Sequence, residues 1–145
     1  MKHKILKIDP YLKPYEKDFD LRASLYEDAC KRLGDLNTFA NGHLYFGFHK
    51  TEDGWYYREW APAAEKLYLT GDFCGWDRYA YPMEKKENGV FELFLPGVNA
   101  LKDGQRVQTL VVSGGKELER IPLYARRVVQ DPNDHSWNAV IYDGK

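Results

Sequence analysis

The chain has 145 residues, of which 43% are hydrophobic, 30% charged and 15% aromatic, which suits one globular domain with an appendage. The 21 basic and 22 acidic residues give a net charge of −1, so the sequence lacks the basic excess of a nucleic-acid-binding protein. It has neither an apolar run long enough to span a bilayer nor a signal peptide, because Lys7 and Asp9 interrupt the first apolar residues. We therefore expect a cytoplasmic protein with no membrane or nucleic-acid partner.

Residues 1–40 predict an N-terminal helical segment. Residues 9–14 are expected to form an extended lead-in, because two prolines disfavour the α conformation in the residues before them. Apolar residues then recur every three or four positions over 15–33, and Gly34 provides a stop signal. A short second helix is expected at 35–39, capped by its first residue, an aspartate.

Residues 41–130 change to an alternating pattern of apolar and polar residues. Short alternating stretches follow one another at roughly ten-residue spacing, bounded by Gly, Pro and Asn turn signals. The expected strands are 43–49, 55–60, 66–70, 90–95, 105–112, 117–121 and 124–129. This pattern indicates a mainly β fold, an immunoglobulin-like β-sandwich that follows the helical segment.

Residues 131–145 are expected to be a linker. Their first half is rich in turn residues, and a short apolar run at 139–142 follows. An apolar run in this position needs a partner to cover it, so we expect a further domain beyond it.

Two tryptophans stand where the regular pattern breaks. Trp60 ends a predicted strand just before Pro62, and Trp76 lies in the turn-like stretch 71–77. A tryptophan at a turn either packs under a loop or offers a flat apolar face to a ligand such as a sugar ring. Both alternatives are open for each of them.

Metal and disulfide chemistry find little support. The two cysteines, Cys30 and Cys74, are too few and too isolated for a disulfide framework or a metal site. The four histidines show no ligand spacing. We expect no metal and no cofactor.

Several motifs in succession resemble eukaryotic-type glycogen (1,4-α-glucan) branching enzymes. The resemblance covers nearly the whole chain, although Cys74 stands where that family usually has asparagine. The motifs are DPYLKPYE at 9–16, YFGFH at 45–49, EWAPAA at 59–64, LTGDFCGW at 69–76 and RIPLYARRVVQD at 120–131.

The resemblance implies a helical segment followed by a family-48 carbohydrate-binding module at 41–130. In the full enzyme these precede a catalytic (β/α)8 barrel, which alone needs roughly 250 residues. The catalytic carboxylates therefore lie outside this sequence, and we assign no catalytic residue and no branching activity to it. The implied partners are α-1,4-glucan and the missing barrel, and the parent enzyme would convert α-1,4 chain segments into α-1,6 branches.

The resemblance also suggests which residues contact glucan. Trp60 and Pro62 would form a sugar platform beside a rigid corner, or Trp60 would pack into the sandwich. Trp76 would stack on glucose, as in related modules of a glycogen-sensing kinase subunit, or would plug the end of the sandwich. Asn88 and Gly89 would contact sugar hydroxyls from a turn near Trp60, or would form a plain hairpin turn.

Two other functions remain open. The chain could be a free-standing glycogen-binding regulatory module, although such a module needs neither the helical lead-in nor the 126–131 exit. It could also be an immunoglobulin-like protein-interaction domain whose aromatic residues serve protein contacts.

Overall fold

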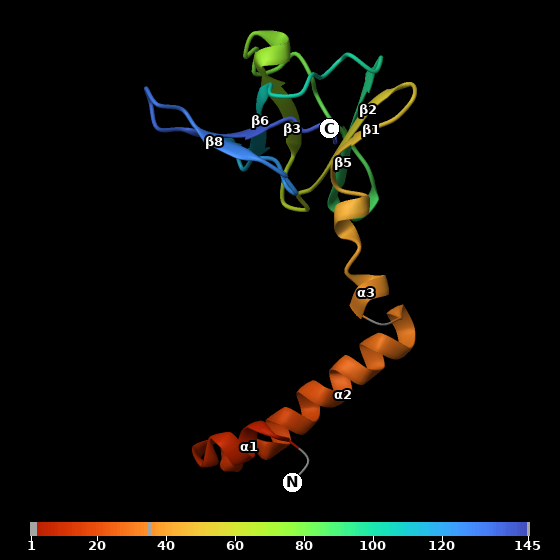
Figure 1. The fold of residues 1–145 in the computed structure, drawn as a ribbon, viewed down its shortest axis with the longest axis vertical. Helices are drawn as coiled ribbons and strands as arrows, with labels where there is room; N and C mark the ends of the chain where they lie inside the picture. Colours follow the sequence, from red (N-terminus) through yellow and green to blue (C-terminus); the bar gives the residue numbers. More distant parts are fainter. Residues whose placement is uncertain (1–2, 35, 145) are drawn as a thin grey trace. The chain divides into compact units, whose positions relative to one another are not determined.

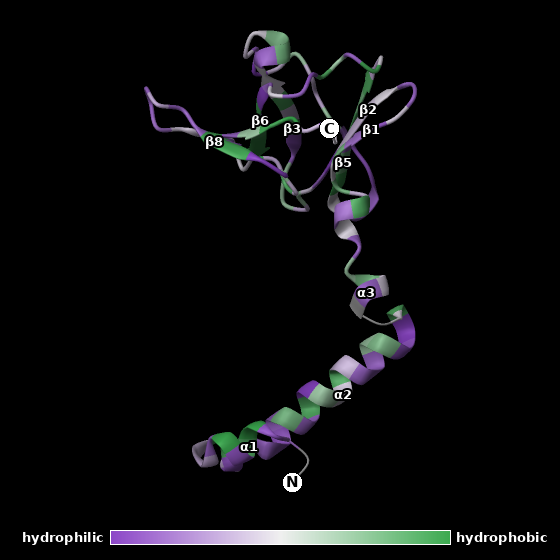
Figure 2. Cartoon of the chain, in the orientation of Figure 1, coloured by the Kyte–Doolittle hydropathy of each residue, from purple (hydrophilic) through white to green (hydrophobic). Residues whose placement is uncertain are grey.

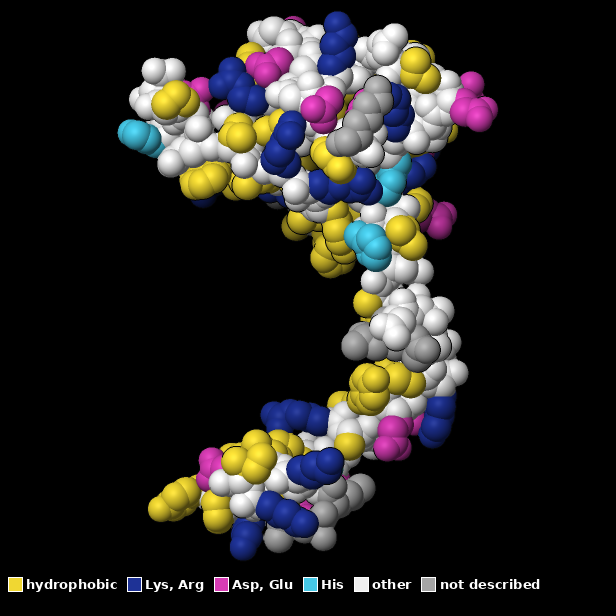
Figure 3. Space-filling view, viewed as in Figure 1, with side chains coloured by type: hydrophobic (Ala, Val, Ile, Leu, Met, Phe, Trp, Pro, Cys, Tyr) yellow, Lys and Arg dark blue, Asp and Glu magenta, His cyan; other side chains and the backbone are white. Residues whose placement is uncertain are grey.

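A computed structural model describes residues 3–34 and 36–144, which belong to two compact units, Met1–Gly42 and His43–Lys145. The first unit is helical and the second is built from two sheets (Figure 1). Hydrophobic side chains are exposed on the surface of both units (Figure 3).

The helical unit begins with α1 (Ile5–Ile8) and a 3-10 helix (Pro10–Tyr15), which replaces the extended lead-in expected there. The lead-in was wrong because Asp9 caps this helix: its carboxylate accepts the N–H of Tyr11 at 3.0 Å. A proline in the first helical position needs no N–H partner, so Pro10 favours the helix start.

The long helix α2 (Glu16–Leu33) agrees with the sequence pattern. Gly34 ends it with a φ of 87°, and its N–H donates to the carbonyl of Cys30 at 2.9 Å. Apolar and polar residues alternate along α2 (Figure 2), and it keeps Leu21, Leu25 and Tyr26 exposed. A short helix, α3 (Leu36–Phe39), follows where it was expected; its predicted cap, Asp35, lies outside the described residues.

The second unit consists of two antiparallel sheets. The first has the order β1-β2-β5-β4, and the second has the order β3-β6-β9-β8 with β7 also paired to β6. The strands are β1 (Gly47–Lys50), β2 (Gly54–Trp60), β3 (Lys66–Gly71), β4 (Glu84–Lys85), β5 (Val90–Pro96), β6 (Arg106–Ser113), β7 (Lys116–Arg120), β8 (Val128–Gln130) and β9 (Trp137–Val140).

The core lies between the two sheets. Trp55 and Tyr57 of β2 and Phe91 of β5 are buried from one side, and Leu67 and Leu69 of β3 from the other. Residues at every second position of β2 and β5, and Leu67 and Leu69 of β3, point into the core, as a period of two requires. The structure confirms the expected β-sandwich with an N-terminal helical segment.

Residues 131–145 differ from the expected linker. They contain β9, which pairs with β6 through Arg106↔Val140 and with β8 through Val129↔Asn138. Ala139 and Ile141 are each 1% exposed and belong to the core. The partner that this apolar run requires is therefore β6 of the same sandwich.

A buried polar network joins the two sheets. The Glu59 carboxylate of β2 is fully buried and accepts hydrogen bonds from the Tyr57 hydroxyl and, at 2.7 Å, from the Arg120 guanidinium of β7. The Tyr57 hydroxyl also meets that of Thr109 on β6 at 2.5 Å. Burial and the neighbouring Glu59 charge raise the pKa of Tyr57 well above 10.0, so the hydroxyl stays protonated and can donate.

Candidate glucan-binding site

The corner at the end of β2 carries an exposed tryptophan. Because side chains alternate along a strand, Glu59 points into the sandwich and Trp60 points out of it, 54% exposed. The indole N–H of Trp60 donates to the carbonyl of Asn88 at 2.9 Å. This bond ties the ring to the turn before β5 and leaves much of its surface open.

Pro62 and Gly89 make the second contact of this corner. The N–H of Ala61 donates to the carbonyl of Gly89 at 2.8 Å. Asn88 and Gly89 have φ values of 56° and 76°, the left-handed pair of a tight turn. A Cβ on Gly89 would lie 2.6 Å from the Cα of Pro62, so a side chain would displace the proline.

The structure thus brings four of the five predicted site residues together. Trp60, Pro62, Asn88 and Gly89 form one surface, which we call the Trp60 corner. The corner offers a flat ring, a rigid proline and a turn with exposed backbone, the combination that suits a sugar with an apolar face and a rim of hydroxyls.

Two grooves border the Trp60 corner. One, of about 660 Å³, is lined by Tyr45, Asn88 and residues of β4 and β5. The other, of about 360 Å³, is lined by Phe46, Trp60, Leu123 and Tyr124. Sequence reasoning missed these aromatic neighbours, although the aromatic-rich stretch 43–49 could have indicated them.

Trp76 lies apart from this corner. The loop after Trp60 leads into the start of β3, whereas Trp76 follows the end of β3. There the backbone N–H of Trp76 donates to the carbonyl of Gly71 at 3.0 Å. A six-residue strand spans roughly 17 Å, so one compact sugar-binding subsite cannot include both rings. Cys74 holds the turn, since its thiol donates to the same Gly71 carbonyl at 3.4 Å.

The Trp76 ring is half-buried in a polar setting. Its indole N–H donates to Asp72 at 3.0 Å, and the Arg106 guanidinium lies 5.9 Å from the ring centroid. Partial burial opposes ionisation of Asp72, but hydrogen bonds from Arg106 and Trp76 hold the pKa of its carboxyl below 3.8. The carboxylate therefore remains charged and fixes both side chains.

A groove of about 290 Å³ beside Trp76 includes a residue that sequence reasoning missed. Asn138 of β9 lines it together with Arg106 and Gln108. The Asn138 side chain is 3% exposed, and its Oδ1 has no hydrogen-bond partner among the described residues. A buried acceptor without a partner is unfavourable, and this oxygen lies beneath the surface of the groove, out of reach of a ligand. Asn138 was overlooked because its segment was interpreted as a linker.

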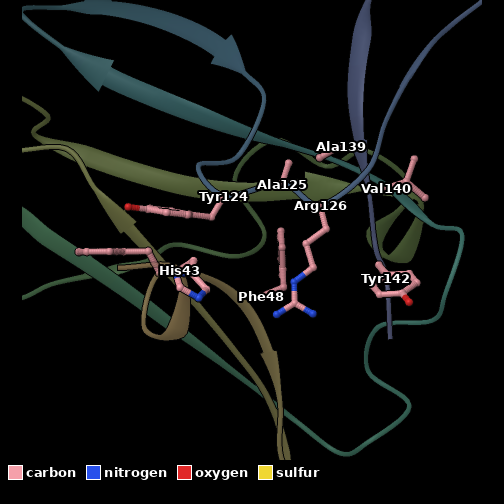
Figure 4. A pocket seen from close by; sticks show the side chains of 9 residues that line it. His43, Phe48, Tyr124, Ala125, Arg126, Ala139, Val140 and Tyr142 are labelled. Carbon is pink, nitrogen blue, oxygen red and sulfur yellow. The ribbon is translucent and has the colours of Figure 1, made fainter. Parts of the chain in front are cut away.

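A narrower cleft of about 220 Å³ lies beside β1 (Figure 4). Phe48, Tyr124 and Tyr142 line it, and the Arg126 guanidinium lies beside the Phe48 ring. Its lining is mainly apolar, so it offers fewer partners for sugar hydroxyls than the groove beside Trp76.

Metal binding and membrane insertion find no support in the described part of the chain. Among residues 3–34 and 36–144, no group of three or more His, Cys, Asp or Glu side chains is arranged to hold a metal ion. No helix in these residues is both long and apolar enough to cross a membrane.

Comparison with protein families identifies the β unit. Residues 45–133 match the family described as carbohydrate-binding module 48 (isoamylase N-terminal domain). The chain belongs to this family. The match includes the Trp60 corner and Trp76 and ends within the turn that precedes β9.

Curated relatives of this carbohydrate-binding module 48 protein are 1,4-α-glucan-branching enzymes. The enzyme of Equus caballus is 33% identical and that of Dictyostelium discoideum 32%, each over 97% of this chain. The alignments span 22% of either relative, so this chain corresponds to about a fifth of their length.

Solved structures share the fold. The catalytic module of a multi-modular glycogen-degrading pneumococcal virulence factor superimposes with a TM-score of 0.54 and 21% identity, over 68% of this chain and 16% of its own. Pullulanase type I from Bacillus subtilis superimposes with a TM-score of 0.52 and 20% identity, over 66% of this chain and 12% of its own. At these identities the likeness concerns the β-sandwich alone.

Proposed function

We propose that this carbohydrate-binding module 48 protein binds α-1,4-glucan, such as glycogen or maltooligosaccharides, through the Trp60 corner. The observation that carries the proposal is the exposed Trp60 ring, fixed by Asn88 and flanked by a proline packed on Gly89. The family match and the branching enzymes among the relatives support this choice of ligand.

The expected affinity is weak. Covering one sugar ring with an aromatic side chain removes about 100 Å² of apolar surface, which stabilises the complex by about 2–3 kcal/mol. A few hydrogen bonds contribute about 1 kcal/mol each, and the lost freedom of the partners subtracts from the sum. Dissociation constants in the high micromolar to millimolar range follow.

Weak binding suits a module that acts beside a catalytic domain. A long glucan offers many binding positions, and a tether raises the effective concentration. We propose that this chain is the N-terminal region of a cytoplasmic 1,4-α-glucan branching enzyme and that its module holds α-1,4 chains near the catalytic barrel. The 97% coverage of this chain by branching enzymes, helical unit included, favours this role over a free-standing regulatory module.

A second glucan contact at Trp76 is the alternative site. The polar lining of the 290 Å³ groove favours it, because Arg106 and Gln108 offer hydrogen-bond partners for sugar hydroxyls. The half-buried ring leaves less surface for stacking than Trp60 does.

Affinity electrophoresis in gels that contain glycogen or maltoheptaose tests the proposal. The wild-type chain should be retarded, and Trp60→Ala should lose the retardation with an unchanged circular dichroism spectrum. Trp137→Ala is the matched control, because Trp137 is 52% exposed but lies on β9, away from the corner.

Three outcomes separate the alternatives. Loss in Trp76→Ala with retention in Trp60→Ala would move the site to the Trp76 groove. A wild-type chain that is not retarded in either gel would contradict glucan binding and favour a protein-interaction domain. The reading frame beyond Lys145 distinguishes a branching enzyme, in which a barrel follows, from a regulatory module, in which none does.

A further inference from the structure

We propose that the glucan site continues from Trp60 onto Tyr124, across the groove between them, and that Glu59 is the residue that positions Tyr124. The proposal rests on glucan binding at the Trp60 corner and extends it. It adds a second aromatic subsite for further glucose units of the same α-1,4 chain.

The two rings border one groove. Tyr124 is 50% exposed and lines the 360 Å³ groove with Trp60, while Phe46 and Leu123 complete its lining. The Tyr124 ring stacks on the Phe46 ring with centroids 5.9 Å apart and planes 9° apart. One face of the tyrosine is therefore supported from below, and its hydroxyl adds a donor and acceptor to an otherwise apolar lining.

The backbone of Tyr124 has an unusual conformation. Its φ is 56°, in the left-handed region that bulky residues rarely adopt. Such a conformation persists only where the surroundings determine it, and it often marks a functional position. A type of residue that avoids this conformation is held here beside an exposed tryptophan.

Gly47 is one of the groups that hold Tyr124 in place. Gly47 is buried at the start of β1, and a Cβ there would lie 3.2 Å from the Cβ of Tyr124 and 3.4 Å from its carbonyl oxygen. The φ of 88° at position 47 also favours glycine over other residues. A side chain at position 47 would therefore press on the Tyr124 segment, which would have to move by a few tenths of an ångström.

Glu59 is the second such group. Its Oε1 accepts the N–H of Leu123 at 2.6 Å, and its Oε2 accepts the Arg120 guanidinium at 2.7 Å. A buried carboxylate bound on both sides fixes the chain from Arg120 to Leu123, immediately before Tyr124. Glu59 also precedes Trp60 in β2, so adjacent residues carry one ring and anchor the other.

Two aromatic rings that line one groove suit an extended polymer better than a single sugar. A short oligosaccharide would occupy the Trp60 corner alone, whereas a longer chain would also cover Tyr124. The signature of this arrangement is an affinity that rises with chain length.

Isothermal titration of the 145-residue chain with maltotriose and maltoheptaose measures this rise. We expect maltoheptaose to bind about tenfold more tightly, the equivalent of about 1.4 kcal/mol. Tyr124→Ala should bind maltotriose as the wild type does but lose the tenfold gain, and Tyr124→Phe should keep most of it because the ring remains.

Glu59→Gln tests the positioning role. The amide retains an acceptor but places donors opposite the Arg120 guanidinium, so the anchor of the Tyr124 segment weakens. We expect an unchanged maltotriose affinity and a loss of most of the gain. Thr109→Val is the control, because it removes a hydroxyl from the same network without touching Leu123, and it should keep the gain. If Glu59→Gln does not fold, Glu59→Asp replaces it, because the shorter side chain keeps the charge opposite Arg120 but withdraws the acceptor from the Leu123 N–H.

The results separate this inference from the function on which it rests. A wild type that binds neither oligosaccharide contradicts glucan binding itself. Equal affinities of the wild type for the two oligosaccharides, or a Tyr124→Ala variant that keeps the gain, overturn the Tyr124 subsite and leave the Trp60 corner standing. A Glu59→Gln variant that behaves as Thr109→Val overturns the positioning role alone.

Discussion

Gly89→Ala tests whether close packing between two turns shapes the Trp60 corner. Gly89 has a φ of 76°, and a non-glycine residue in this region costs about 1–2 kcal/mol. The added methyl would also lie 2.6 Å from the Cα and 2.7 Å from the Cβ of Pro62, both closer than ordinary contact. Overpacking of this kind costs a further ~1–3 kcal/mol.

Gly104→Ala separates the two effects. Gly104 has a φ of 86°, but a Cβ there would meet nothing within 4 Å. It should therefore lose only the conformational part of the stability, about 1–2 kcal/mol. We expect Gly89→Ala to be less stable than Gly104→Ala by about 1–3 kcal/mol in urea denaturation.

Glucan affinity provides the second measurement for the same pair. If Pro62 and the Asn88 carbonyl shift, the corner loses about one or two contacts of about 1 kcal/mol each, or roughly fivefold to thirtyfold in affinity. Gly104→Ala should bind as the wild type does. The reasoning is refuted if the two variants match in both stability and affinity, because the contact with Pro62 would then have no effect.

Three further predictions concern the buried network and the absence of catalysis. Arg120→Ala leaves the Glu59 charge unpaired and should lower the free energy of unfolding by about 3 kcal/mol, measured in urea. Substitution of the exposed Arg126 by alanine should change it by less than about 0.5 kcal/mol. Equal effects of the two substitutions would contradict a buried ion pair. The pKa of Tyr57 is raised in the folded protein, so the neutral hydroxyl contributes to the free energy of unfolding below pH 10.0. This contribution is lost as the pH rises above 10.0. The melting temperature of the wild type should fall at alkaline pH, and that of Tyr57→Phe should fall less steeply. Parallel plots of melting temperature against pH for the two proteins would contradict this role of Tyr57. The chain alone should leave the iodine stain of amylose unchanged, and a shift caused by purified protein would reveal a catalytic site.

The sandwich was predictable because its strands carry clear local signals. The strand from Gly54 to Trp60 and the strand from Val90 to Pro96 are rich in aromatic and aliphatic residues and are bounded by turn residues, so both composition and turn signals agree. The stop of α2 at Gly34 is equally local. The 3-10 helix at Pro10–Tyr15 was missed, because the capping carboxylate of Asp9 outweighed the usual effect of proline on the preceding residue.

The candidate site was predictable only where its residues are close in sequence or belong to a resembling motif. Trp60 and Pro62 stand together, and Asn88 and Gly89 were placed by strand order. Asn138 reaches its position through the pairing of β9, and Tyr124 through contacts with Gly47 and Phe46, and periodicity reveals neither of these long-range contacts. β9 in particular follows a turn-rich stretch, so its short apolar run looked like a tail instead of a strand.

The placement of β9 has a consequence for biogenesis. This strand is inserted between β6 and β8, and Ile141, which directly follows it, is among the largest fully buried side chains. A nascent chain that has emerged only as far as residue 130 would leave Arg106 and Val107 of β6 without their β9 partner, although β7 already covers the rest of that edge, and would leave the hydrophobic interior open. Closure of the sandwich must therefore wait until the ribosome has released residue 141, and cotranslational folding of this domain is expected to be late and cooperative.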